Sequence, residues 1–173
     1  MHDNIEIKQS ILTIGSGELG IWKRSVIADE SLFNQLFQFV FSGDHQIAWR
    51  ACWIIDNAAE EFPELLVDKL PDLIAGLLAT KDSSLKRHFT RILCRYQIPE
   101  EYLGAIVNRC FELLTPSEPP AVRVYAMQLL FNITILQPDL KGELISVIQG
   151  LMEEGGTAGF INRAEKLLRL LRH

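Results

Sequence analysis

The sequence has no run of about 18 apolar residues free of charge, which is the length that a membrane-spanning helix requires. Its first residues, MHDNIE, also lack the basic start and the apolar stretch of a secretory signal peptide. These two absences predict a protein that does not span a membrane and that is located in the cytoplasm.

Cysteine is scarce. The chain has only three cysteines, and they are Cys52, Cys94 and Cys110. None has a CxxC partner, their number is odd, and each lies within an apolar helical pattern. We therefore expect reduced, buried thiols and neither disulfides nor a zinc site.

The motifs of common catalytic and cofactor sites are missing as well. The four histidines, which are His2, His45, His88 and His173, are scattered and form no HExxH pair. No GxxxxGK[ST] loop occurs, and Gly15-Ser16-Gly17 lacks the strand and spacing of a dinucleotide fingerprint. We expect no metal and no cofactor, and the missing motifs favour a non-enzymatic protein over an enzyme.

Positive charge is in deficit. The formal net charge is -5 at pH 7, whereas nucleic-acid binders usually carry a basic surplus, so a nucleic-acid partner is not expected. The hydrophobic fraction of 48% and the length of 173 residues fit one folded domain, residues 1–173, that buries a sizeable core.

What the chain does contain is a repeat. Apolar residues recur in the order apolar, three residues, apolar, two residues, apolar, apolar, at steps of 37 or 38 residues. The four copies are Ile47, Ala51, Ile54, Ile55; Leu85, Phe89, Ile92, Leu93; Val122, Ala126, Leu129, Leu130; and Phe160, Ala164, Leu167, Leu168. Each copy predicts a helix, which we call the A helix of its repeat.

A second helix follows each of the first three A helices. Pro63, Pro99 and Pro138 each stand beside an acidic residue just before a new apolar-periodic run, as expected in the first turn of a helix. We call these second helices B helices and expect Pro63 to start the first one, although Pro71 could kink it or mark its true start. The pattern predicts repeats at 45–82, 83–118 and 119–156, and a closing helix at 157–173.

Residues 1–44 are less regular and are expected to form a capping unit, because terminal repeats are commonly atypical. The apolar residues between Leu32 and Phe41 predict a B helix that ends at Ser42-Gly43-Asp44. Its partner is either Leu19–Ala28 or Ile5–Ile14, and the sequence leaves both open.

Part of this pattern resembles the HEAT repeat. Leu70-Pro71-x-Leu73 leads to Asp82 and then to Leu85-Lys86, and the next unit carries Val122-Arg123 in the corresponding place. The resemblance covers residues 45–172, although Lys86 replaces the usual arginine and the period is shorter than usual. It implies an all-α fold, a right-handed α-α superhelix (an armadillo-like HEAT solenoid) of about four helix pairs.

HEAT proteins are mostly scaffolds or adaptors, so the resemblance implies a non-enzymatic protein-binding function. A minority are enzymes, and a HEAT-like DNA glycosylase is the alternative. A homodimer formed through the terminal units is a third alternative. No particular partner or pathway follows from the residues.

Two tryptophans mark a candidate binding patch. Trp49, Trp53 and Asp56 lie at helical spacing along one flank of the first A helix. Trp53 occupies a repeat position that holds a polar residue in the other three A helices, which makes it a candidate exposed anchor for a partner. Packing beneath the irregular N-terminal unit is the ordinary interpretation, and both remain open.

Acidic residues gather on the predicted B helices. If B helices line the concave side, as they do in HEAT proteins, that side is acidic and suits a protein partner or a basic peptide. The residues assigned to this face are Asp68, Asp72, Glu101, Glu112 and Glu143. The alternative is that these are ordinary solvated acids near helix starts, where the helix dipole favours them.

Overall fold

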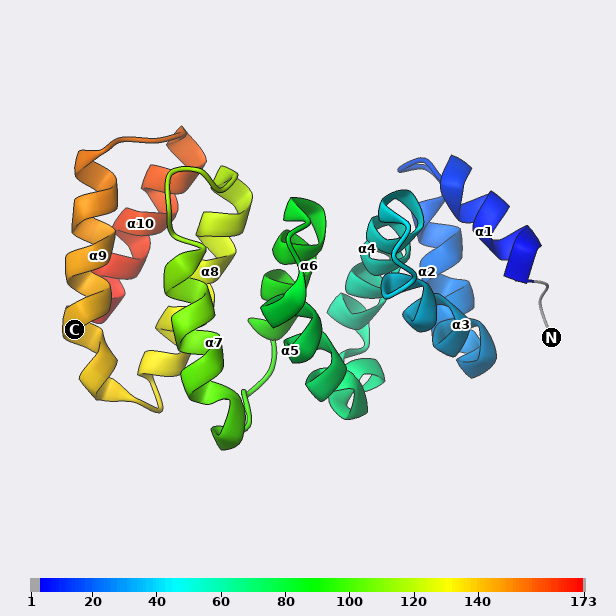
Figure 1. The fold of residues 1–173 in the computed structure, drawn as a ribbon, viewed down its shortest axis with the longest axis horizontal. Coiled ribbons are helices and arrows are strands. Elements are labelled where there is room, and N and C mark those ends of the chain that lie inside the picture. Colours follow the sequence, from blue (N-terminus) through cyan, green and yellow to red (C-terminus); the bar gives the residue numbers. More distant parts are fainter. Residues whose placement is uncertain (1–3, 173) are drawn as a thin grey trace. The chain divides into compact units, whose positions relative to one another are not determined.

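A computed structural model describes residues 4–172, so His2 and His173 lie outside the described residues. The described chain forms ten α-helices and two short 3-10 helices and no β-strand, which confirms the predicted all-α fold class (Figure 1). The helices divide into two units, the first ending at Ile92 and the second beginning at Leu93. The organisation into one domain stays a prediction.

The first unit contains six α-helices, the last of which ends one residue into the second unit. They are α1 (Asn4–Thr13), α2 (Leu19–Ala28), α3 (Glu30–Val40), α4 (His45–Glu61), α5 (Leu70–Ala79), preceded by the 3-10 helix η1 (Pro63–Lys69), and α6 (Ser83–Leu93). Both candidate partners for the N-terminal B helix are helical. The helix α2 packs against both α3 and α4, while α1 packs on α4.

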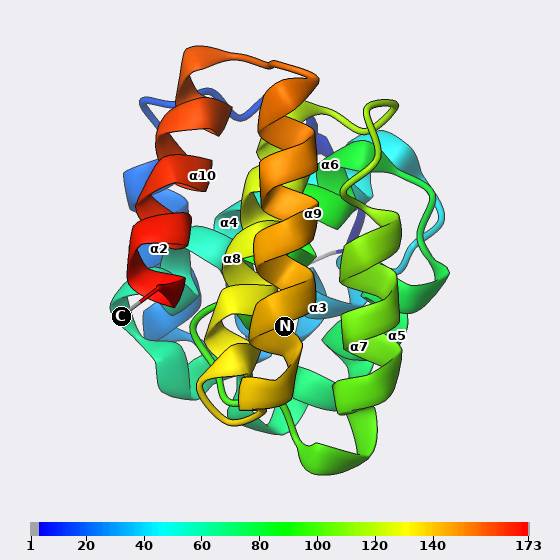
Figure 2. The same cartoon turned by 90° about the vertical axis from the view of Figure 1, so that its left-hand side faces the viewer.

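The second unit contains four α-helices. They are α7 (Glu100–Glu112), α8 (Pro120–Thr134), α9 (Lys141–Glu153), preceded by the 3-10 helix η2 (Pro138–Leu140), and α10 (Ala158–Leu171). The helix α8 contacts α7, α9 and α10. Figure 2 shows α9 and α10 side by side and antiparallel, joined by the loop at the end of α9.

The repeating apolar positions form the core of both units. All sixteen A-helix positions predicted above are buried except Leu85, which is half-buried. Burying each leucine, isoleucine, valine or phenylalanine among them contributes about 1.5–3 kcal/mol. The periodic pattern therefore predicted the inward face of each A helix, and this burial holds the helices together.

Short polar side chains fix where several helices begin. The Asp44 carboxylate accepts hydrogen bonds from the backbone N–H groups of Gln46 and Ile47, at 2.9 and 3.1 Å, at the start of α4. Asp82 does the same for Ser84 and Leu85, at 2.7 and 3.1 Å, at the start of α6. Such caps satisfy N–H groups that have no partner within the helix.

Two of the three prolines lie at the predicted start of a B helix, and the third lies upstream of its helix. Pro99 directly precedes α7, and Pro138 opens η2 just before α9. Pro63, however, opens only the 3-10 helix η1, and α5 begins at Leu70 with Pro71 in its first turn. The expected start at Pro63 was therefore wrong for the α-helix, because Pro71 has no N–H to continue a helix from the preceding turn.

Candidate functional site

The predicted tryptophan patch lies on α4. The Trp49 and Trp53 ring centroids are 6.2 Å apart, and both side chains are half-buried. The Arg50 guanidinium lies 4.5 Å from the Trp49 ring centroid, a cation–π arrangement. The two rings thus form a partly exposed aromatic pair with a basic neighbour.

Asp56 does not belong to that exposed patch. Its side chain is 0% exposed, and its Oδ2 lies 2.8 Å from His88 Nδ1 and 2.7 Å from Arg91 Nη1 of α6. The expectation that Asp56 joins the tryptophans at a surface is therefore corrected. A buried carboxylate has to be paired, and α6 supplies both partners.

Arg91 extends this network outward. Its Nη2 donates to Glu60 Oε2 at 2.7 Å, at an exposed position on α4. Burial works to lower the pKa of Arg91, but Asp56 and Glu60 outweigh it, so the pKa lies above its ordinary value. Arg91 occupies the same repeat position as Trp53. The polar residue found at this position in the later A helices was the sequence signal for a polar link between successive A helices.

A hollow of about 680 Å³ lies between α3 and α5 in the first unit. We call it the Phe41 groove, and its lining residues are Asn34, Phe37, Gln38, Phe41, Lys69, Asp72, Ala75, Gly76 and Ala79. A second hollow, of about 460 Å³, adjoins it and shares Phe41, Gly76 and Ala79. Most of this lining is apolar, as in many binding grooves.

Phe41 is the central side chain of the groove. It is 45% exposed, its ring stacks on Phe89 at 6.1 Å, and it meets Phe37 edge-on at 5.4 Å. Gly76 lets α5 approach, because a Cβ there would lie 3.0 Å from both the Phe41 and Phe89 rings. The sequence analysis missed this groove, although the small residues Ala75, Gly76 and Ala79 on one side of α5 were a readable signal.

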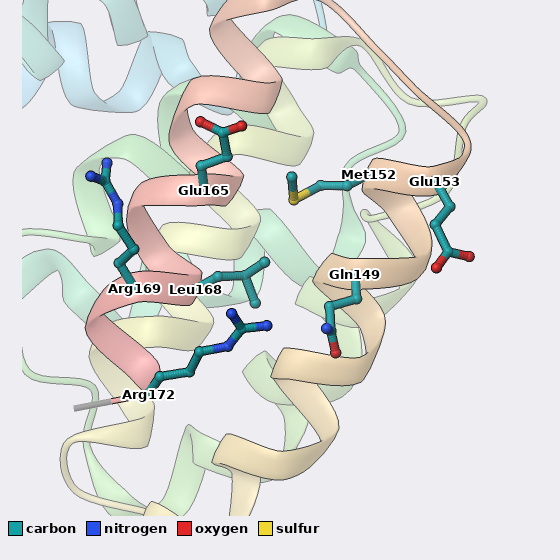
Figure 3. A pocket seen from close by; sticks show the side chains of 7 residues that line it. All are labelled: Gln149, Met152, Glu153, Glu165, Leu168, Arg169 and Arg172. Atoms are coloured by element: carbon teal, nitrogen blue, oxygen red, sulfur yellow. The ribbon is translucent and has the colours of Figure 1, made fainter.

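The second unit has a hollow of its own between α9 and α10, of about 550 Å³. Figure 3 shows that the side chains of Met152, Leu168 and Arg172 extend into this space, whereas Glu153 points away from it. Arg169 extends along the outer side of α10. The hollow is open to solvent, and both Arg169 and Arg172 belong to its lining.

A family model for the HEAT repeat domain matches residues 14–169. The chain belongs to the HEAT-repeat family. The match includes α2 and α3, so it reaches further towards the N-terminus than the resemblance over residues 45–172. No curated protein and no solved structure matched the chain in two further comparisons.

HEAT repeats generally mediate protein–protein interactions, and the predicted acidic residues of the B helices bear on this function. The predicted acidic residues are all exposed, and they are Asp68, Asp72, Glu101, Glu112 and Glu143. Asp68 lies in the 3-10 helix η1 and Asp72 in the first turn of α5, both in the first unit, and the other three lie in the second unit. Whether they share one face stays a prediction.

Most of these acids are unpaired. Glu112 Oε2 accepts from Arg109 Nη1 at 2.9 Å, while the other four make no ion pair within residues 4–172. Asp72 lies at the edge of the Phe41 groove, which joins the predicted acidic surface to the apolar hollow in the first unit.

The three cysteines differ in their burial. Cys52 and Cys110 are buried as expected, but Cys94 is only half-buried. Burial raises the pKa of the Cys110 thiol, which disfavours the nucleophilic thiolate. Among the described residues, no cluster of three His, Cys, Asp or Glu side chains could hold a metal, and no helix is long and apolar enough to cross a bilayer.

Proposed function

We propose that this HEAT-repeat protein is a non-enzymatic interaction module that binds a basic segment of a partner protein through its B helices. One observation supports this most directly: Asp68 and Asp72 are exposed and unpaired among the described residues, and Asp72 borders the Phe41 groove. A carboxylate without an internal partner is available to a partner's lysine or arginine. Binding then breaks no existing ion pair.

Such a surface acts mainly on the rate of encounter and on the choice of partner. Complementary charge accelerates association, and this effect weakens as salt screens the charges. We therefore expect the affinity to fall as the salt concentration rises. Apolar contacts in the groove would supply the part of the binding free energy that salt does not weaken.

The half-buried pair of Trp49 and Trp53 is a second surface within this proposal. Tryptophan is enriched among the residues that dominate interface energies, because it buries a large rigid area. Their rings belong to an A helix, so this patch and the acidic residues of the B helices can be altered separately.

The test begins with affinity capture, followed by reconstitution of binding from the purified protein and the purified partner. Changing Asp68→Lys and Asp72→Lys together should weaken the reconstituted complex about tenfold, which corresponds to about 1.4 kcal/mol. The matched control is Glu6→Lys with Glu165→Lys, because these two exposed acids lie outside the B helices and give the same change in net charge.

The control pair should change the affinity less than about twofold. Equal losses for both double variants would mean that only the overall charge matters, and this would overturn the assignment to the B helices. Light scattering at several protein concentrations measures self-association in parallel. A partner that competes with a second copy of the chain for the same surface would reduce this self-association.

A further inference from the structure

We propose that the Phe41 groove binds an amphipathic helix of a partner protein, with apolar side chains over Phe41 and a basic side chain beside Asp72. This inference rests on the proposed protein-binding function and specifies the occupant of one surface. It uses only residues of the first unit.

The floor of the groove suits bulky apolar side chains. Phe41 is 45% exposed, whereas Phe37 beneath it is buried. On the opposite side, α5 presents Ala75, Gly76 and Ala79, whose small side chains leave the hollow of about 680 Å³ open. An exposed aromatic ring beside an open, largely apolar hollow is a surface that gains free energy when a partner's apolar side chain covers it.

The Phe41 ring is held in place before any partner arrives. It stacks on Phe89, which is buried, and α5 approaches both rings closely at Gly76. A ring fixed by its neighbours loses little conformational freedom on binding, and this preorganisation favours affinity. Phe41 is therefore well placed as the anchor of the groove.

A helical occupant fits the groove better than an extended one. The walls are α3 and α5, whose backbone N–H and C=O groups are largely bonded within the helices, so they offer no strand edge to an extended chain. A helix satisfies its own backbone groups and needs only side-chain contacts. The walls are each about 15 Å long, which matches about three turns of a partner helix.

The charges around the groove favour a basic occupant. Of the charged residues in its lining, Asp72 is exposed and makes no ion pair within the described chain. The one neighbouring cation on this segment, Lys69, lies 5.4 Å from the Phe37 ring centroid. Since the Lys69 ammonium lies over the Phe37 ring, the Asp72 carboxylate at the groove edge is available to a lysine or arginine of the partner.

The probe is a fluorescent 14-residue peptide of leucine and lysine, with leucine at positions i, i+3, i+4 and i+7 to form one apolar helix face. Fluorescence anisotropy measures its affinity for the full chain at low and high salt. Three comparison peptides are a version with glutamate in place of lysine, a scrambled isomer without an apolar face, and a version interrupted by proline.

The groove variant is Ala75→Gln with Ala79→Gln, which fills the hollow with neutral side chains that helices tolerate well. Its matched control is Ala105→Gln with Ala121→Gln, two exposed alanines in the second unit that line neither the Phe41 groove nor the hollow adjoining it. Thermal unfolding of each variant verifies that the fold is intact.

We expect the lysine peptide to bind, the groove variant to weaken it at least tenfold, and the control to change it less than twofold. Asp72→Lys should also weaken it, and the effect should shrink at high salt. Absence of binding, equal loss in the control, or equal affinity for the glutamate, scrambled or proline-interrupted peptide would each overturn the proposal.

The reconstituted partner separates this inference from the proposed function. If the partner's affinity responds to reversal of Asp68 and Asp72 but not to the groove variant, the protein-binding function stands and the helical occupant of the groove is wrong. If the partner's affinity responds to neither change, the assignment to the B helices fails as well.

Discussion

His88 Nδ1 lies 2.8 Å from Asp56 Oδ2, and this buried contact joins α6 to α4. The other ring nitrogen, Nε2, lies 3.0 Å from Arg87 Nη2. A guanidinium can only donate, so Nε2 accepts and the proton of the neutral ring resides on Nδ1, which donates to Asp56. Two neighbouring A helices are thus connected by a hydrogen bond from His88 to Asp56 as well as by their apolar stripes.

Removing the cation beside Asp56 should destabilise the fold strongly. In an Arg91→Met variant, the buried Asp56 carboxylate keeps His88 but loses the guanidinium at 2.7 Å. Losing one charge-assisted hydrogen bond to a buried carboxylate that keeps His88 costs about 1.5–3 kcal/mol. Urea unfolding followed by circular dichroism measures this loss.

The control for this change is Glu60→Gln, which alters the other carboxylate that Arg91 contacts. The Glu60 side chain is largely exposed, so its ion pair should be worth less than about 1 kcal/mol. Equal effects of the two substitutions would show that burial of Asp56 does not determine the energy of the network.

The cap of α6 should give a pH-dependent contribution to stability. Partial burial works to raise the pKa of Asp82, but hydrogen bonds from His45 and from the Leu85 and Ser84 backbone outweigh it, so the pKa lies below its ordinary value. A carboxylate with a lowered pKa stabilises the fold above its unfolded-state value of 3.8, and this contribution is lost as the pH falls through the folded-state pKa.

Two substitutions separate the charge of Asp82 from its role as a cap. Asp82→Asn keeps a side-chain oxygen for the Ser84 and Leu85 N–H groups, whereas Asp82→Ala removes it and should cost about 1 kcal/mol more. The stability difference between the wild type and Asp82→Asn should shrink as the pH falls below 3.8. A difference that is constant over this range would contradict the assigned role of the charge.

The fold was predictable because its main signal is local and periodic. The spacing from Val122 to Leu130 defines one buried helix face without knowledge of any other helix, and the same spacing recurs in each repeat. The displaced start of α5 shows the limit of such a pattern. Pro63 and Pro71 both suit a first helical turn, and only the three-dimensional backbone distinguishes them.

The surfaces were less predictable because they depend on contacts between helices. Asp56 and Trp53 share a flank of α4, yet the carboxylate is buried by residues that come more than 30 positions later. The Phe41 groove likewise requires small residues on α5 beside a ring at the end of α3. Neither relationship is visible within a single helix.

Two glycines should respond oppositely to the same substitution. Gly104 lies inside α7 with nothing near its missing Cβ, so Gly104→Ala should stabilise the protein by about 0.5–1 kcal/mol through helix propensity. At Gly76 the new methyl group would lie 3.0 Å from the Phe41 and Phe89 rings. Crowding of this kind costs about 1–3 kcal/mol, which offsets or exceeds the gain.

Thermal unfolding of the two glycine variants measures this difference. Gly76→Ala should also displace the Phe41 ring, because the new methyl group pushes on both rings and only Phe41 has open space on its solvent side. Aromatic NMR signals report that movement. Equal stabilisation by both substitutions would show that α5 does not approach the rings as closely as described.

The DNA-glycosylase alternative can be tested directly. We expect no salt-sensitive binding to a short duplex and no release of an alkylated base, because the net charge is -5 and the Asp56 carboxylate is buried against His88 and Arg91. Anisotropy with a labelled duplex at low salt, together with a base-release assay, provides the measurement. Tight binding that weakens steeply with salt would contradict the protein-binding function.

Trp53 allows packing and partner binding to be separated. Its ring is half-buried beside Trp49, so Trp53→Ala should lower the free energy of unfolding by less than the about 3–5 kcal/mol of a fully buried ring. If the ring is also an anchor, the same variant should weaken the reconstituted partner complex about tenfold. Trp53→Phe keeps an aromatic ring in the packed part and serves as the control. A loss of stability as large as that of a core residue, with unchanged partner affinity, would assign Trp53 to packing alone.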